Sequence, residues 1–246
     1  MLKKSVSVVI PAFNESGRLP QTLRDVHAWL QNSVEHFEII IVDDGSTDDT
    51  REVVVNLARQ LSNIILITNP RNRGKGAVVR QGLRQASGEI ICYMDADHST
   101  HIKELLPAAD LIAHGADVAV GSRYLAGSRI MRRQPSHRVL VSRLANLFIR
   151  AWLVPGILDT QNGFKVFIRL AIKKTLPYLS VNGWAFDVEL LFVSRRLGQK
   201  IVEFPVTWQN DKASRLRVIK AVLGGCRELT HIMIRRIQGG YPRLKK

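Results

Sequence analysis

The 246-residue sequence predicts an α/β protein built on a mainly parallel, Rossmann-like β-sheet with helices on both faces. Short, continuously apolar runs alternate with segments of helical spacing, which is typical of parallel strands that are buried on both faces. A polar or acidic cluster directly follows the apolar runs of the first half. Ligands of open α/β sheets bind at the carboxyl ends of the strands, so these clusters predict a binding site.

The expected elements of the first half follow one another regularly along the chain. Strands are expected at 6–11, 37–42, 64–68, 89–94 and 117–121. Helical spacing of apolar residues lies between them, for example at Leu19, Leu23, Val26 and Leu30. The carboxyl ends of parallel strands meet on one edge of a sheet, so we expect the five strand-end clusters to form one site.

The second half of the chain is expected to be more helical. Residues 129–158 are interpreted as one or two basic amphipathic helices, with further helices at 168–176 and from about 184. A strand is expected at 201–208. Residues 216–237 carry an apolar stripe at helical spacing, so 211–246 is predicted to be a basic amphipathic C-terminal helix with a tail.

The net charge of +15 indicates a polyanionic partner, which could be nucleic acid, an anionic membrane or a phosphate-rich substrate. The charge is concentrated in the second half. Residues 129–150 contain six arginines and no acid, and residues 211–246 contain ten lysines and arginines against two acids. Cys92 and Cys226 lie in apolar runs, so we expect two buried free thiols and no disulfide.

The acidic triplet from Asp95 to Asp97 follows the fourth expected strand. Two carboxylates at alternate positions of an extended segment point to the same side, and carboxylate oxygens suit Mg²⁺ or Mn²⁺ together with a diphosphate. A solvated turn is the alternative interpretation, because aspartate is common in turns. The neighbouring strand-end clusters favour the metal site.

Two further strand-end clusters suit a nucleotide. Asp43 and Asp44 end the second strand, where an acid can bind a ribose or base, although a helix cap is the alternative. Lys75 and Gly76 open a helix, whose backbone amides form a natural phosphate site. The spacings of a P-loop and of a dinucleotide-binding fingerprint are absent, which argues against kinases, other NTPases and nicotinamide enzymes.

Two features of the second half leave alternatives open. Asp187 and Glu189 lie two residues apart at a helix start, so at most one of them faces a substrate. Asp187 is a candidate general base if the acceptor is a hydroxyl. The stripe of the last helix could lie in a membrane interface or pack against the sheet.

Several motifs together resemble the inverting family-2 glycosyltransferases of the GT-A fold. These are PAFNE at 11–15, VDDGSTD at 42–48, NRGKG at 72–76, DAD at 95–97 and GSR at 121–123. Other motifs are similar to the dolichyl-phosphate β-glucosyltransferase branch: DTQNGFK at 159–165, WAFDVELL at 184–191, and PVTW at 205–208 followed by Ser214 and Arg215. SRLAN at 142–146 is similar to a motif of dolichyl-phosphate mannose synthases.

The resemblance implies roles for individual residues. The expected catalytic residues are Asp95 and Asp97, with Asp187 added as the candidate base for a hydroxyl acceptor. The expected donor-binding residues are Pro11, Ala12, Phe13, Glu15, Asp43, Asp44, Lys75, Gly76, Asp95, Ala96, Arg123 and Arg215. The expected metal ligands are Asp95, Asp97 and Ser99, where Ser99 replaces a glutamine ligand of the mannose synthases. Arg138, Arg143 and Arg215 are expected to bind the acceptor phosphate.

The resemblance also implies an activity. It is inverting transfer of a hexose, glucose from UDP-glucose, to polyprenyl or dolichyl phosphate, with Mg²⁺ or Mn²⁺ as cofactor. A phosphate acceptor is already an anion, so no strong base is needed. GDP-mannose as donor and a non-lipid sugar as acceptor are the alternatives. A basic nucleic-acid-binding protein is a remote alternative, because no zinc spacing or RNA-binding motif is present.

The expected partners and location follow from the same resemblance. We expect a nucleotide-sugar donor, a polyprenyl-phosphate acceptor, no nucleic acid and no stable protein partner. The sequence lacks the N-terminal anchor of eukaryotic glucosyltransferases, so peripheral attachment to the cytoplasmic membrane face is expected. The predicted catalytic domain is 1–210, with a nucleotide-sugar half at 1–123 and an acceptor-side half at 124–210, followed by the extension at 211–246.

Overall fold

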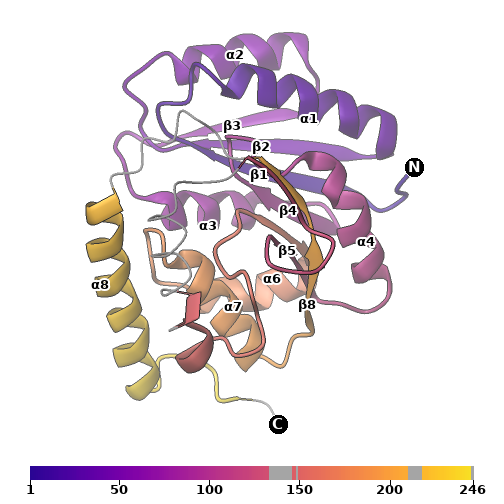
Figure 1. The fold of residues 1–246 in the computed structure, drawn as a ribbon. Coiled ribbons are helices and arrows are strands. Elements are labelled where there is room, and N and C mark those ends of the chain that lie inside the picture. The colour runs from indigo at the N-terminus through magenta and orange to yellow at the C-terminus, as the bar shows by residue number, and fades with distance from the viewer. Residues whose placement is uncertain (133–145, 148, 210–217, 245–246) are drawn as a thin grey trace.

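The computed structural model describes residues 1–132, 146–147, 149–209 and 218–244. Its centre is a seven-stranded sheet of order β3-β2-β1-β4-β7-β5-β8, in which β7 alone runs antiparallel to its neighbours (Figure 1). The strands are β1 (Val6–Ala12), β2 (Phe37–Asp43), β3 (Ile64–Thr68), β4 (Ile90–Met94), β5 (Val118–Ser122), β7 (Phe164–Ile168) and β8 (Ile201–Pro205). The predicted mainly parallel α/β fold is therefore confirmed.

Helices cover both faces of this sheet, as Figure 1 shows. The helices of one face are α1 (Leu19–Ser33), α2 (Thr50–Gln60) and α4 (Leu105–Ala113). Those of the other are α3 (Lys75–Gln85), α6 (Arg169–Thr175), α7 (Phe186–Arg196) and α8 (Val218–Ile237). Successive strand residues alternate between the two cores: Val8 and Ile10 pack on the α1 side, and Val9 packs on the α3 side.

Strand β7 was not predicted, and it changes the composition of the functional edge. Its sequence FKVFI is five residues long and carries a lysine, so its strand signal is weak. Because β7 runs antiparallel between β4 and β5, its amino end lies at their carboxyl ends. Asp95 N accordingly donates to Gly163 O at 3.0 Å. The loop at 159–163 therefore reaches the same edge as the predicted clusters.

The prediction of helix from residue 129 was wrong. Residues Arg129–Arg132 form strand β6, which pairs in parallel with β9 (Thr207–Gln209). The described helical residues of this region are 146–147 and 149–152. The single strand expected at 201–208 is divided into β8 and β9, and β8 ends at Pro205, which has no backbone N–H to donate.

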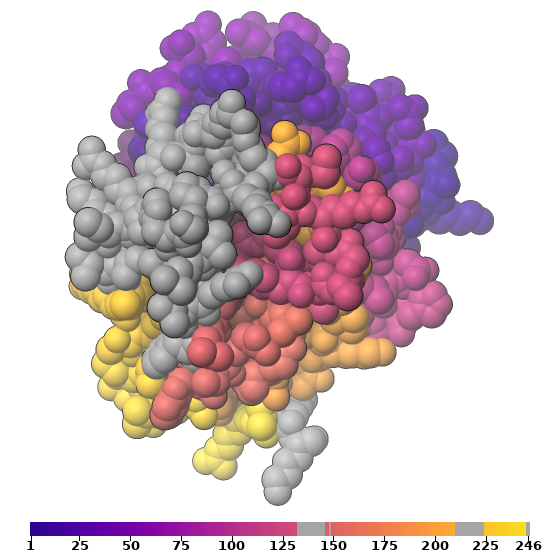
Figure 2. Space-filling view, in the orientation of Figure 1, coloured from indigo at the N-terminus to yellow at the C-terminus, as the bar shows by residue number. Residues whose placement is uncertain are grey.

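Helix α8 packs against the core on the α7 side of the sheet in the part whose side chains are described. Ile232 is fully buried, and Leu229 and Met233 pack on the same core, which supports the core alternative for this stripe. Cys226 is exposed, so the prediction of a buried thiol was wrong there, whereas Cys92 is buried and both thiols are free. Arg236 of α8 donates to the Trp152 carbonyl at 2.9 Å. In Figure 2 the yellow α8 accordingly lies near the red-orange segment that contains residues 149–160.

Among the helices that the structure describes, none is long and apolar enough to cross a bilayer. Strands β7 and β8 come from the second half of the chain but belong to the same sheet as β1 to β5. The predicted boundary at residue 123, between a nucleotide-sugar half and an acceptor-side half, therefore does not separate two sheets, and it stays a prediction about function. The boundary predicted at 210 falls where residues 210–217 are outside the described part.

Candidate functional site

The predicted strand-end residues meet at one edge of the sheet. Asp44 N donates to Ala12 O at 2.8 Å, which joins the ends of β1 and β2. The acidic triplet follows β4, and the Thr22 hydroxyl of α1 donates to Ala96 O at 2.9 Å. The Phe13 side chain is 43% exposed at this edge, next to the partly buried Pro11.

Glu15 holds the loop after β1 in place. Its backbone N donates to the Thr50 hydroxyl at 2.8 Å, and its carboxylate forms an ion pair with Arg18. Asn14 has a φ of 56°, and its side-chain oxygen accepts from Thr47 N at 2.8 Å. The loops after β1 and β2 are thus bonded to each other.

Asp43 and Asp44 both accept hydrogen bonds from backbone amides of loops, and neither caps helix α2. Asp43 accepts from Ser46 N at 3.1 Å and lies 3.4 Å from the Arg51 guanidinium. Asp44 accepts from Arg73 N at 2.7 Å and Gly74 N at 2.9 Å. Burial raises the pKa of Asp44 and the two amide bonds lower it, with a net rise. Asp44 thereby fixes the loop that leads to Lys75.

Lys75 lies at the centre of the edge, at the start of α3. Its Nζ is 2.8 Å from Asp95 Oδ1 and 3.9 Å from Asp187 Oδ2, and it lies 4.8 Å from the centre of the Trp184 ring. Burial would lower the pKa of Lys75, but Asp95 and Asp187 raise it further, so the ammonium form is favoured.

Glycines bring the start of α3 close to the start of α7. A Cβ on Gly76 would lie 2.5 Å from Phe186 Cβ and 2.7 Å from Val181 O. Gly74 has a φ of 95°, and a Cβ there would lie 2.5 Å from Asn182 O. This close approach holds Lys75 near Asp187.

Asp95 and Asp97 face the same edge in different surroundings. The side chain of Asp95 is 33% exposed and accepts from the Tyr93 hydroxyl at 3.2 Å. Asp97 accepts from Ser99 N at 2.9 Å. Burial and the charge of Asp95 raise the pKa of Asp97, while the Ser99 hydrogen bonds lower it. Ser99 therefore orients Asp97.

The donor set fits a small divalent cation that also binds a diphosphate. Among the described residues, no group of three or more histidines, cysteines or acids is arranged to hold a metal ion. Mg²⁺-type sites commonly use only one or two carboxylates, because substrate phosphates and waters complete the shell. The Lys75 ammonium beside Asp95 also indicates that this carboxylate accommodates a positive charge.

The two histidines next to the triplet have local roles. His98 Nε2 accepts from Ile102 N at 3.2 Å, at the start of the 3₁₀ turn Ile102–Glu104, and its ring lies 4.6 Å from that of His101. Burial and the neighbouring His101 lower the pKa of His98 to about 4. His98 is therefore a neutral hydrogen-bond acceptor.

Arg123 is held by Asp159, which belongs to the motif at 159–165 but was not expected to pair with it. Its Nε and Nη2 donate to the buried Asp159 at 2.7 and 2.8 Å, and its backbone N donates to the same carboxylate at 2.9 Å. Burial alone would lower the pKa of Arg123, but Asp159 raises it. Glu203 on β8 accepts from Asp159 N at 2.8 Å. This network fixes the charge of Arg123 at the end of β5.

Asp187 and Glu189 point in different directions, as their spacing predicted. Glu189 accepts from Ser180 N and Val181 N, both at 2.8 Å, and from the Tyr241 hydroxyl at 2.6 Å, away from the edge. Asp187 faces the edge and accepts from Lys165 Nζ at 2.6 Å. The isolated lysine within FKVFI was the available signal for Lys165, because a charge in a buried strand needs a partner.

Three predicted residues, Arg138, Arg143 and Arg215, lie outside the described residues. The remaining predicted donor and metal residues lie on the five strand ends or on the helix starts that follow them. The acceptor-phosphate prediction therefore stays a prediction.

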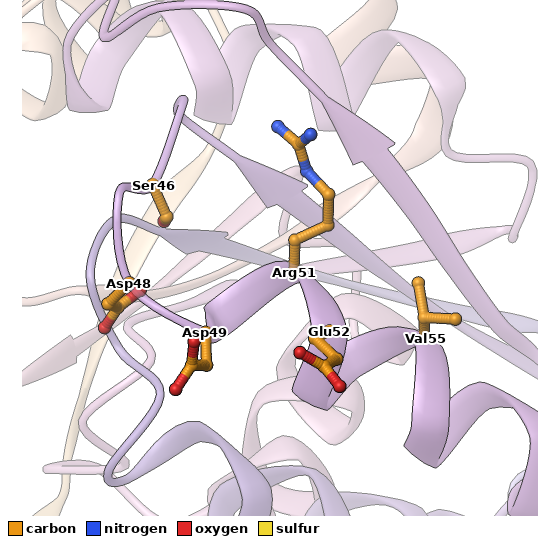
Figure 3. Close-up of a pocket in the computed structure, with 6 residues that line it drawn as sticks. All are labelled: Ser46, Asp48, Asp49, Arg51, Glu52 and Val55. Atoms are coloured by element: carbon orange, nitrogen blue, oxygen red, sulfur yellow. The ribbon is translucent and has the colours of Figure 1, made fainter.

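A surface pocket lies at the start of α2 (Figure 3), and its lining includes no residue of the Asp95 triplet. It is lined by Ser46, Asp48, Asp49, Arg51, Glu52 and Val55. Three acids against one arginine make this pocket unsuitable for a diphosphate. Arg51 and Ser46 connect it to the edge, because both contact Asp43.

Comparison with known proteins identifies related sequences. Residues 7–176 match the family described as glycosyl transferase family 2. A dolichyl-phosphate beta-glucosyltransferase of Trichomonas vaginalis is 36% identical over 223 residues, which cover 87% of this chain and 68% of that protein. The human protein of the same name is 31% identical over 97% of this chain and 78% of its own length.

Solved structures share the fold at lower identity. A mannosyltransferase from Pyrobaculum calidifontis, in complex with GDP-Man and Mn²⁺, has a TM-score of 0.69 and 20% identity over 97% of this chain and 65% of that one. A glucosyl-3-phosphoglycerate synthase from Mycobacterium tuberculosis, bound to UDP, has a TM-score of 0.67 and 21% identity over 95% of this chain and 80% of that one. These likenesses support the GT-A fold.

Proposed function

The chain belongs to glycosyl transferase family 2, and from that premise we propose that it transfers glucose from UDP-glucose to a polyprenyl phosphate of the dolichyl type. The observation that carries this proposal is the meeting of Lys75, Asp95 and Asp97 at the carboxyl edge of the sheet. These groups suit a metal-bound diphosphate, and relatives at 31–36% identity are named for transfer to dolichyl phosphate.

The donor would lie along the edge from β1 to β4. The residues proposed to bind its nucleoside follow β1 and β2, namely Pro11, Ala12, Phe13, Glu15, Asp43 and Asp44. The diphosphate would lie near Lys75 and the backbone of Gly76, where a helix N-terminus and an ammonium favour a negative charge. Asp44 supports this role, because it holds the preceding loop by two amide hydrogen bonds.

Asp95 and Asp97 would hold Mg²⁺ or Mn²⁺, with Ser99 orienting Asp97 through the 2.9 Å hydrogen bond. The cation, when bound, would neutralise the charge that develops on the departing nucleoside diphosphate. The ammonium of Lys75, 2.8 Å from Asp95 Oδ1, would add to that effect. Catalysis would depend on positioning and on charge stabilisation.

The proposed nucleophile is an oxygen of the acceptor phosphate. It attacks the anomeric carbon while the bond from that carbon to the nucleotide oxygen breaks, which inverts the configuration. An ionised phosphate carries no proton to be removed, so the reaction needs no general base. Arg123, fixed by Asp159, and the predicted Arg138, Arg143 and Arg215 would supply positive charge for the phosphates.

We further propose that the protein lies peripherally on a membrane surface, where a polyprenyl phosphate would be found. Exposed apolar side chains of the second half support this: Leu147, Trp152, Ile234 and Ile237. Arg236 links α8 to the Trp152 backbone within this group. Sedimentation with vesicles that contain anionic lipid tests this point, and no binding at low ionic strength would refute it.

The proposed activity is tested by one radiolabel assay. The protein is incubated with dolichyl phosphate, Mn²⁺ and labelled UDP-glucose, UDP-N-acetylglucosamine or GDP-mannose, and the products are extracted into organic solvent. We expect label in the organic phase with UDP-glucose. Label with GDP-mannose alone would favour the mannose alternative, and no extractable label with any donor would refute a lipid acceptor.

A further inference from the structure

Four side chains of alternating charge lead from the sheet interior to the proposed metal position. The Lys165 ammonium is fully buried on β7 and donates at 2.6 Å both to Asp187 Oδ1 and to Asn162 O. Asp187 Oδ2 lies 3.9 Å from Lys75 Nζ, and Lys75 Nζ lies 2.8 Å from Asp95 Oδ1.

Lys75 therefore lies between two carboxylates and is closer to Asp95. Its ammonium is covered by the rings of Trp184 at 4.8 Å and Tyr93 at 5.5 Å. A lysine side chain has a flexible four-carbon stem, so its ammonium can exchange one nearby carboxylate for another. A divalent cation arriving at Asp95 has to compete with this ammonium, since like charges repel.

The pair of Lys165 and Asp187 is suited to decide whether the Lys75 ammonium or a divalent cation lies at Asp95. A buried ammonium is costly unless it is paired, so an apolar residue would fill the β7 position better if packing were its only role. Asp187 begins α7, and the close contact of Gly76 with Phe186 holds that helix start against Lys75. The backbone positions of Lys75 and Asp187 are therefore set by rigid elements, and the flexible lysine stem alone decides where the ammonium lies between the two carboxylates.

We propose that Lys165 and Asp187 are positioning residues that control where the Lys75 ammonium lies, and through it how readily Asp95 takes a divalent cation. Lys165 neutralises Asp187 and so limits its attraction for Lys75. With a cation held by Asp95, the Lys75 ammonium would shift toward Asp187, its other neighbouring carboxylate. This inference rests on the metal site of the proposed function.

The test measures Mn²⁺ binding to the full chain without nucleotide, from the electron paramagnetic resonance signal of free Mn²⁺. In Lys165→Met, the uncompensated Asp187 draws Lys75 away from Asp95, so Mn²⁺ affinity should rise by about fivefold, within the range of ordinary site couplings. In a Lys75→Met background, the same Lys165→Met change should leave Mn²⁺ affinity unaltered. Lys173→Met, an exposed lysine of α6, is the matched control and should bind as the wild type does.

The Lys75 background separates this proposal from a general charge effect. If Lys165 acted on the cation only through its charge, Lys165→Met would raise Mn²⁺ affinity whether or not Lys75 is present. An equal rise in both backgrounds therefore overturns the proposal, as does no rise in either. Asp187→Asn provides the second variant if Lys165→Met does not melt cooperatively. It should lower Mn²⁺ affinity only when Lys75 is present, and a fall in both backgrounds or none overturns the proposal.

The wild type distinguishes failure of this inference from failure of the metal site. If the wild type binds no Mn²⁺ even with UDP added, the proposed metal site and this inference both fail. If it binds Mn²⁺ and Lys165→Met binds equally well, the metal site stands and the positioning role of Lys165 is refuted.

Discussion

Replacement of Gly163 by alanine should displace the Asp95 carboxylate without altering the chemistry of any charged residue. A Cβ at residue 163 would lie 1.9 Å from Asp95 Oδ2 and 2.2 Å from its Cγ. Ordinary contact begins at 3.4 Å, so the carboxylate must move by about 1.5 Å. The backbone offers little relief, because Asp95 N donates to Gly163 O and joins β4 to the start of β7.

A displacement of that size should reduce catalysis strongly. Misplacement of a catalytic group by about 1 Å can lower a rate by about 100-fold, so kcat/KM of Gly163→Ala should fall by at least about that factor. Mn²⁺ affinity should fall as well, because Asp95 is a proposed ligand. The assay is initial-rate kinetics of lipid glycosylation, together with Mn²⁺ titration and thermal melting.

The matched control for this prediction is Gly17→Ala. Gly17 lies in the loop between β1 and α1, and a Cβ there would have no atom within 4 Å. This variant should keep wild-type kinetics. If Gly163→Ala also transfers glucose at the wild-type rate while melting normally, the assignment of Asp95 to the site is refuted.

Three further predictions concern stability and the metal. Asp159→Asn should lower the free energy of unfolding by about 3 kcal/mol, because it breaks the buried pair with Arg123; urea unfolding measures this, and an unchanged midpoint contradicts it. The pKa of His98 is about 4 in the folded state and about 6.5 in the unfolded state. Between these two values the unfolded chain binds one more proton than the folded chain, so the free energy of unfolding falls as the pH falls from about 6.5 to about 4. Between pH 7 and pH 5 in EDTA, His98 should account for a loss of about 2 kcal/mol, and His98→Asn should remove that part of the pH dependence; an unchanged slope contradicts it. EDTA should abolish transfer, Mn²⁺ should restore it, and far-ultraviolet circular dichroism should not change, whereas full activity in EDTA contradicts the metal role.

The parallel strands could be predicted because their sequences carry the signal locally. Runs such as the one at 39–42 are apolar at every position, which is typical of a strand covered on both faces. The acidic triplet at 95–97 could likewise be assigned to the functional edge, since it directly follows such a run. In these segments the local sequence pattern is enough to predict both the strand and the edge of the sheet at which its carboxyl end lies.

The remaining features depend on contacts between distant segments. Strand β7 carries Lys165, whose burial is tolerated only because Asp187, 22 residues later, accepts its hydrogen bond. No periodicity in the sequence reveals this pair. Asp159 belongs to the family motif at 159–165. Its ion pair with Arg123, 36 residues earlier, depends on the antiparallel insertion of β7 beside β5. Cys226 was expected to be buried because its neighbours are apolar, and the orientation of α8 leaves it exposed.

The proposed acceptor chemistry is tested most directly by comparing two lipids that differ only in the phosphate. Labelled UDP-glucose and Mn²⁺ are incubated with the protein and either dolichyl phosphate or dolichol, and the organic phase is counted. Because the proposed nucleophile is a phosphate oxygen, we expect lipid-linked glucose from dolichyl phosphate and none from dolichol, with Asp97→Ala inactive on both. Equal labelling of the two lipids, or labelling of neither, would contradict this account.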